Sequence, residues 1–185
     1  MISVNNYPAP PLCEKEILRY AGGGNDEVRA VLAECLREAA GKFIYKVCRI
    51  TVPVTVQSET VHMGQLSVPS SDLAKNLSGC ENAVIFAATV GFFTDRAVAK
   101  YGVVSPLKAL LFQAIGAERI EALCDAVNSE YRGKPRFSPG YGDLPLSFQR
   151  DIFSLLQCEK HIGLTLNDNL IMSPSKSVTA IIGLI

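Results

Sequence analysis

The segment Arg136–Pro145, RFSPGYGDLP, concentrates the residues best suited to chemistry. Its prolines fix the backbone angle φ, and its glycines permit conformations barred to other residues. Such a segment loses little entropy when held in one shape, and it exposes N–H and C=O groups to a ligand. Arg136 supplies a guanidinium fork that suits a carboxylate, Tyr141 an aromatic face and Asp143 an anion. These residue types are equally compatible with a tight connection between two helices.

Other reactive groups are scattered along the chain. His62 and His161 have no second ligand at metal-binding spacing, so we expect no metal site. None of the six cysteines lies in a CxxC pair, which favours free thiols in a cytoplasmic setting over disulfides or zinc ligation. No Ser/Cys–His triad can be assembled, so no catalytic residue is assigned. Lys176, in the loop SPSKS, is a cation that either faces an anionic ligand or is simply solvated.

The composition describes a globular chain without an obvious polyanionic partner. Of its 185 residues, 48% are hydrophobic and 19% are charged, which suits one domain with a real core. Lys plus Arg and Asp plus Glu number 18 each, so there is no electrostatic case for nucleic acid or anionic lipid. No apolar run is long enough to span a membrane, and the N-terminus does not resemble a signal peptide.

Periodicity and capping signals predict the elements that must position the motif in the first half of the chain. Residues 1–12 are Pro-rich and are expected to be irregular. The next predicted elements are a helix over 14–20, a helix from Asn25 or Asp26 to about 42, a strand over 50–56, a strand over 61–68 pairing back on it, and a helix from Ser70 or Ser71 to 77. Pro53 suggests that the first strand is an edge strand or carries a bulge.

In the second half, residues 82–89 (NAVIFAAT) read as a fully buried central strand. The further predicted elements are a helix from about 91 to 101, a long helix from Ser105-Pro106 to about 131, a helix over 146–156, and strands over 169–172 and 178–184. We therefore predict a single α+β domain with a mixed or antiparallel sheet covered by helices. Residues 1–80 form its N-terminal helical and hairpin part, and residues 81–185 its core.

Residues 120–184 resemble the activation domain of vitamin B12-dependent methionine synthase. The family pattern R-x-x-x-G-Y-x-x-x-P is present in full as Arg136, Gly140, Tyr141 and Pro145. Downstream, IGLTL is similar to the family's GMKLT, and SPSKSV stands where the family has a WPGASV turn. Residues 80–119 match more weakly, and the first 80 residues match little.

The resemblance implies a binding site for S-adenosylmethionine. Arg136 would pair with the methionyl carboxylate, which a guanidinium fork suits better than a lysine does. Gly140 would let the backbone approach the ligand, and the backbone of Phe137 and Ser138 would hydrogen-bond it. Tyr141 would line the pocket near the nucleoside and the reactive methyl group.

Three more residues enter this expected site. Glu121 falls where the family places a ligand-binding glutamate and would accept from the α-amino group or a ribose hydroxyl; a solvated helix charge is the alternative. Asp143 has no counterpart and would serve the amine or the adenine, or cap the helix that begins at Leu146. Lys176 would face an anionic ligand or a partner's corrinoid.

The chain also departs from the family pattern. GDLPLSFQRD replaces the histidine-containing continuation PACP-x-H-T-E-K, and Ile181, Ile182 and Leu184 replace aromatic residues near the last strand. These departures point to a divergent, stand-alone branch of the family.

The function implied by the resemblance is support for the reductive reactivation of cob(II)alamin in a separate cobalamin-dependent methionine synthase or related corrinoid protein. The partner carries the cobalamin, S-adenosylmethionine brings the methyl group, and a flavodoxin- or ferredoxin-type donor brings the electron. Such a domain is an accessory, methyltransferase-associated reactivation domain, and the resemblance leaves open whether it is an enzyme by itself. Two alternatives remain. One is a scaffold subunit of another corrinoid methyltransferase system that binds S-adenosylmethionine or corrinoid without methyl transfer. The other is a thiol-based redox protein.

Overall fold

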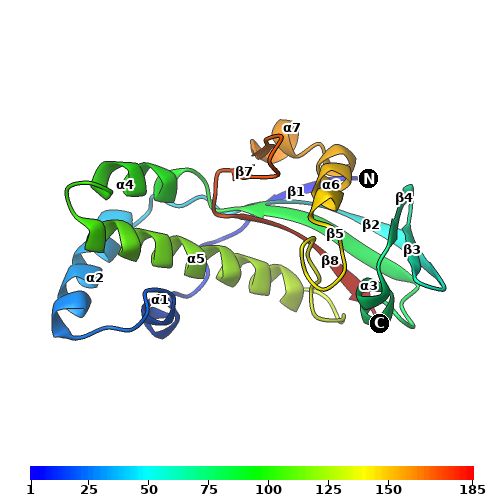
Figure 1. Ribbon diagram of the computed structural model, residues 1–185, viewed down its shortest axis with the longest axis horizontal. Helices are drawn as coiled ribbons and strands as arrows, with labels where there is room; N and C mark the ends of the chain where they lie inside the picture. The colour runs from blue at the N-terminus through cyan, green and yellow to red at the C-terminus, as the bar shows by residue number, and fades with distance from the viewer.

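The computed structural model describes residues 1–185 as an elongated molecule, with a curved sheet in one half and mainly helices in the other (Figure 1). Six strands make the sheet: β1 (Ser3–Asn6), β2 (Lys46–Gln57), β3 (Thr60–Met63), β4 (Leu66–Pro69), β5 (Asn82–Thr89) and β8 (Ser177–Leu184). Their order is β4-β3-β2-β5-β8, with β1 also paired to β2, and every pairing is antiparallel. The predicted α+β class with an antiparallel sheet is confirmed.

Helices cover both faces of this sheet and fill the other half of the molecule. They are α1 (Glu14–Tyr20), α2 (Asp26–Ala39), α3 (Ser71–Asn76), α4 (Phe93–Tyr101), α5 (Pro106–Ser129), the 3-10 turn η1 (Leu146–Phe148), α6 (Gln149–Leu156) and α7 (Cys158–Ile162). Helix α5 runs below the sheet, with α6 and α7 on the opposite face (Figure 1). No helix combines the length and the apolar character needed to cross a membrane.

Local signals in the sequence explain the starts of α2, α3 and α5. The Asn25 side chain accepts a hydrogen bond from the Val28 N–H at the start of α2, and the Ser70 hydroxyl accepts one from the Leu73 N–H at the start of α3. Pro106 opens α5 at the first helical position, where its missing N–H costs nothing. These starts agree with the sequence predictions.

Three apolar clusters form the core. The largest packs one face of the sheet against α3, α6 and α7, and the second packs the other face against the C-terminal half of α5. The third joins α1, α2 and α4 to the N-terminal half of α5. Strand β5 is buried from Ala83 to Thr89 because both of its faces are covered. Each cluster draws residues from both 1–80 and 81–185.

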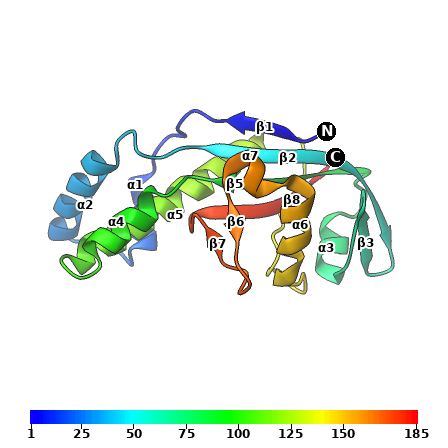
Figure 2. The same ribbon diagram turned by 90° about the horizontal axis from the view of Figure 1, so that it is seen from above.

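Several local expectations were wrong. Residues 3–6, expected to be irregular, pair with β2 as β1; the two strands lie side by side in Figure 2. Residues 61–68 form two strands rather than one, because a turn at Gly64 (φ 58°) separates β3 from β4. Residues 169–172 are mostly a turn, which closes a small hairpin of β6 (Thr165–Leu166) and β7 (Met172–Ser173). Helix α7 was not expected.

Strand β2 is not the edge strand that Pro53 suggested. It pairs with β5 on one side, and on the other with β1 through residues 46–49 and then with β3 through residues 54–57. Pro53 lies between these two stretches, so its missing N–H removes no bond to β1 or β3.

Candidate functional site

The motif segment lies against the outer edge of β8. Lys134 N–H donates to Gly183 C=O at 2.8 Å, and Phe137 and Ile181 exchange both backbone hydrogen bonds, each at 2.8 Å. Residues 133–137 therefore extend the sheet by a short, strand-like piece. This anchoring places Arg136 and Phe137 beside the last strand of the sheet.

The chain then turns tightly through residues 138–144. Tyr141 N–H donates to Ser138 C=O, Leu144 N–H to Tyr141 C=O, and Gly140 N–H to Leu144 C=O, at 2.9–3.1 Å. Gly140 adopts φ 91°, a conformation that side chains disfavour. The turn buries Leu144 in the core and leaves Tyr141 59% exposed. The backbone loop expected from the prolines and glycines is thus present.

Arg136 meets two carboxylates from one face of α5, and we call these three residues the Arg136 cluster. Nη1 of Arg136 lies 2.5 Å from Asp125 Oδ1, and Nη2 pairs closely with Glu121 Oε2. Glu121 and Asp125 share a helix face because they are four residues apart. Burial is the largest single influence and lowers the pKa of Arg136, but the hydrogen bond to Asp125 and the nearby negative charges of Glu121 and Asp125 together raise the pKa above its ordinary value.

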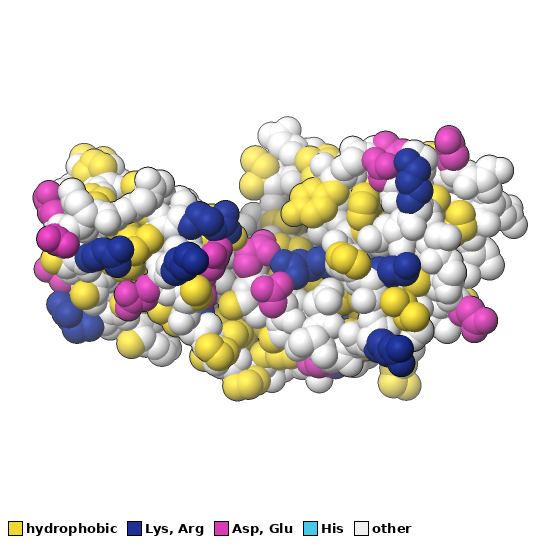
Figure 3. All heavy atoms as spheres, turned by 90° about the horizontal axis from the view of Figure 1, so that it is seen from below, with side chains coloured by type: hydrophobic (Ala, Val, Ile, Leu, Met, Phe, Trp, Pro, Cys, Tyr) yellow, Lys and Arg dark blue, Asp and Glu magenta, His cyan; other side chains and the backbone are white.

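Open space adjoins the Arg136 cluster on the molecular surface. A cavity of about 450 Å³ is lined by Arg136, Tyr141, Pro135, Gly133 and Asn128. The Tyr141 ring packs edge-on against the Phe137 ring, with centroids 6.3 Å apart. Figure 3 shows the face on which α5 lies, where acidic and basic side chains adjoin one another near the middle.

A second cavity, of about 610 Å³, is bordered by α5 and the N-terminal segment. Glu121 and Asp125 line it as well, together with Glu16, Arg19 and Cys13 among others. The two carboxylates of the Arg136 cluster thus border this cavity, while Arg136 borders the other.

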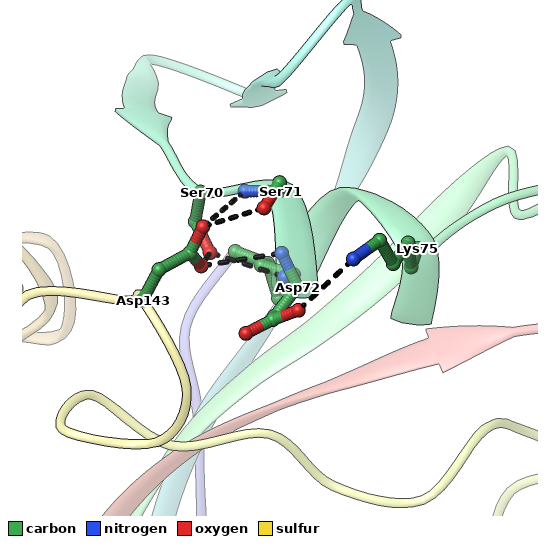
Figure 4. Close-up of polar contacts among 6 residues, drawn as sticks. Ser70, Ser71, Asp72, Lys75 and Asp143 are labelled. Carbon is green, nitrogen blue, oxygen red and sulfur yellow. Dashed lines mark hydrogen bonds and ion pairs between the residues drawn. The ribbon is translucent and has the colours of Figure 1, made fainter.

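Asp143 lies at the start of helix α3 and caps it (Figure 4). Its Oδ2 accepts from both the N–H and the hydroxyl of Ser71 at 2.7 Å, and its Oδ1 accepts from Asp72 N–H at 3.2 Å and from the Ser70 hydroxyl. These hydrogen bonds from Ser70 and Ser71 hold the pKa of Asp143 well below its usual range. The carboxylate does not cap the helix beginning at Leu146, one of the alternatives considered above.

Lys176 lies beside α5, but nearer to its N-terminal end than Glu121 and Asp125 do. Its Cγ would be 2.9 Å from a Cβ added at Gly116, so its stem crosses that helix about 8–14 Å along the axis from Glu121 and Asp125. Burial lowers the pKa of Lys176, and Asp95 partly offsets this. The structure brings Glu121 and the residues 136–141 together but leaves Lys176 and the Asp143 carboxylate apart from them.

Asp125 and the pair Glu118–Arg119 belong to no motif and were not among the predicted site residues. The signal for Asp125 was its i,i+4 spacing from Glu121. Glu118 and Arg119 form a buried ion pair, each side chain only 4% exposed. Arg119 also donates to the carbonyls of Pro10 and Pro11, and Glu118 accepts from Cys13 N–H. The pair therefore fastens the N-terminal segment beside the Arg136 cluster.

The remaining reactive groups form no further centre. No group of three or more His, Cys, Asp or Glu side chains is arranged to hold a metal ion. All six cysteines are free, and all but Cys13 are buried.

Comparison with known proteins identifies a matching family and a solved structure with the same fold. Residues 117–184 match the family described as vitamin B12 dependent methionine synthase, activation domain, which confirms the resemblance drawn from the motif. A crystal structure of the MetH reactivation domain bound to AdoHcy shares the fold, with a TM-score of 0.73 and 13% sequence identity over 99% of this chain and 78% of that one. No curated protein matches the sequence significantly.

Proposed function

We propose, on the premise that residues 117–184 match the activation domain of vitamin B12 dependent methionine synthase, that this chain binds S-adenosylmethionine at the Arg136 cluster. The observation that carries the proposal is the pairing of the Arg136 guanidinium, which lines an open cavity, with two carboxylates of α5. The related structure, by its description, contains AdoHcy, the demethylated form of this compound.

The charges of the cluster suit the ligand. One arginine and two carboxylates sum to a single negative charge, whereas S-adenosylmethionine carries an ammonium, a sulfonium and a carboxylate and is singly positive. The ligand carboxylate would take the Arg136 fork, and the ammonium would take Glu121 or Asp125. Arg136 and the carboxylate that takes the ammonium would thereby each exchange one charged partner for another.

The contribution of the chain would be positioning. S-adenosylmethionine, when bound, supplies a sulfonium methyl group for the corrinoid of a partner, after a flavodoxin- or ferredoxin-type donor has supplied one electron. Arg136 and the α5 carboxylates would fix the amino-acid end of the ligand. Gly140 and the backbone of Phe137 and Ser138 would border it closely, with the Tyr141 ring over the cavity. Holding the reacting groups in line removes part of the entropic barrier.

The first test is calorimetry with S-adenosylmethionine. The native chain should bind it, and Arg136→Ala should lose about 1.5–3 kcal/mol of binding free energy, the range for a hydrogen bond to a charged group. Arg132→Ala, an exposed arginine whose side chain makes no hydrogen bond or ion pair, is the matched control and should bind normally. Absence of binding by the native chain at millimolar ligand would refute the proposal.

The second test addresses the partner. The chain would be added to a cobalamin-dependent methionine synthase held in the cob(II)alamin state, together with a reductant and S-adenosylmethionine. Recovery of methionine synthesis that depends on Arg136 would support reactivation. Binding without recovery would instead favour a scaffold subunit of another corrinoid methyltransferase system.

A further inference from the structure

We infer that helix α3 positions the ligand-binding loop and that Asp143 and Asn76 are its positioning residues. The inference rests on the proposed function, because it concerns how residues 136–142 are held for S-adenosylmethionine. It assigns Asp143 a role that differs from direct ligand contact.

The first support is the contact at the C-terminal end of the loop. All four hydrogen bonds to the Asp143 carboxylate come from residues 70–72, two to each oxygen. Two of these donors, the N–H groups of Ser71 and Asp72, belong to the first turn of α3, where backbone donors lack partners within the helix. Asp143 thus completes the cap that Ser70 begins, and its oxygens are already occupied by protein donors.

The second support is the contact at the N-terminal end of the loop. Asn76, the last residue of α3, donates from Nδ2 to Pro135 C=O at 3.2 Å. Pro135 directly precedes Arg136. The two ends of one short helix therefore hold the two ends of the loop, across sequence separations of 72 and 59 residues.

The third support is the close packing between them. A Cβ at Gly142 would overlap the carboxylate of Asp72, so the loop lies directly against α3 at this glycine. Between the two anchors, Tyr141 is exposed and residues 138–144 are linked to one another by turn hydrogen bonds. A loop fixed at both ends loses less entropy when a ligand binds, and this preorganisation would raise affinity.

The first test measures how variants at the loop anchor change the affinity for S-adenosylmethionine. Asp143→Ala should raise the Kd for S-adenosylmethionine about tenfold or more, because a displaced loop misplaces Arg136. Asp143→Asn retains one acceptor oxygen and should restore part of the affinity. Asp151→Ala, an exposed aspartate on α6 without a hydrogen bond, is the control and should bind as the native chain does.

A second readout reports on the loop itself. The chain contains no tryptophan, so Leu146→Trp introduces a single probe at an exposed side chain close to Gly140. In this background, Asp143→Ala and Asn76→Ala should each shift the emission of the free protein, and Asp151→Ala should not. A variant that only lowers thermal stability should leave the tryptophan emission of the folded protein unchanged.

Coupling between variants separates positioning from contact. If Asp143 acts through α3, Ser70→Ala with Ser71→Ala should raise the Kd, and adding Asp143→Ala should change it little further. Fully additive effects would mean that Asp143 touches the ligand, and unchanged affinity in the folded Asp143→Ala and Ser70→Ala/Ser71→Ala variants would overturn the inference. If Asp143→Ala does not fold, Asp143→Asn and Ser71→Ala decide. Failure of the native chain to bind would instead refute the proposed function.

Discussion

Arg136 and Asp125 lie 11 residues apart in the sequence, and their side chains meet with Nη1 2.5 Å from Oδ1. The contact joins the edge of the sheet to helix α5, with Glu121 as the second partner of the same guanidinium. A ligand carboxylate must therefore compete with Glu121 and Asp125 for Arg136. The ammonium group of the same ligand can pair with a carboxylate that Arg136 releases.

This arrangement predicts the effect of removing one negative charge from the cluster. Glu121→Gln should weaken binding of S-adenosylmethionine by about 1 kcal/mol, less than the range of about 1.5–3 kcal/mol for a hydrogen bond to a charged group, because the Glu121 side chain is 42% exposed and solvent screens its charge. The loss should be smaller for the uncharged-sulfur analogue S-adenosylhomocysteine. Calorimetry with both ligands checks this, and equal or increased affinity for both would show that Glu121 only competes for Arg136.

Because Glu118 and Arg119 form a buried ion pair, we expect that removing one partner will strongly destabilise the fold. Arg119→Met leaves the Glu118 carboxylate buried without its cation and should lower the free energy of unfolding by about 3–5 kcal/mol. Glu118→Leu combined with Arg119→Met should recover much of this loss. Urea unfolding measures both, and Arg19→Met, which breaks an exposed pair with Glu16, serves as the control with little expected change.

Leu144 and Leu146 form a matched pair within the motif turn and its exit. Leu144 is 2% exposed and packs in the largest core cluster, whereas Leu146 is 45% exposed. Leu144→Ala should cost about 2–5 kcal/mol of unfolding free energy through the lost burial and the cavity left behind. Leu146→Ala should change it by about 0.5 kcal/mol or less. Similar losses in the two variants would mean that the turn is not anchored through Leu144.

The hydrogen bonds to the Asp143 carboxylate lead us to expect that its contribution to the free energy of unfolding depends on pH in the acid range. Its pKa in the folded state lies below the unfolded value of about 3.9, so its carboxylate stabilises the fold above that pH. The contribution is lost as the pH falls through the lowered folded-state pKa. The difference in unfolding free energy between the native chain and Asp143→Ala should be constant near neutral pH and shrink below about pH 4. Denaturant unfolding at several pH values checks this, and a difference that stays constant under acid would contradict it.

The sequence by itself determined the local features of this protein. The caps at Asn25 and Ser70 and the Ser105-Pro106 start lie next to the backbone groups that they satisfy, so residue types suffice to predict them. The uninterrupted apolar run of β5 needs only its own residues to predict burial. The RFSPGYGDLP motif likewise predicted a constrained loop and a family resemblance, because its prolines and glycines restrict the chain locally.

Tertiary structure alone decided which groups the motif contacts. The sequence offered Asp143 to a ligand or to the next helix, but the carboxylate lies on α3, 72 residues away along the chain. The pairing of Arg136 with Asp125 depends on how α5 crosses the edge of β8, and the pairing of β1 with β2 on how the N-terminal segment returns to the sheet. Such contacts depend on the packing of distant elements, and no local periodicity or capping rule encodes them.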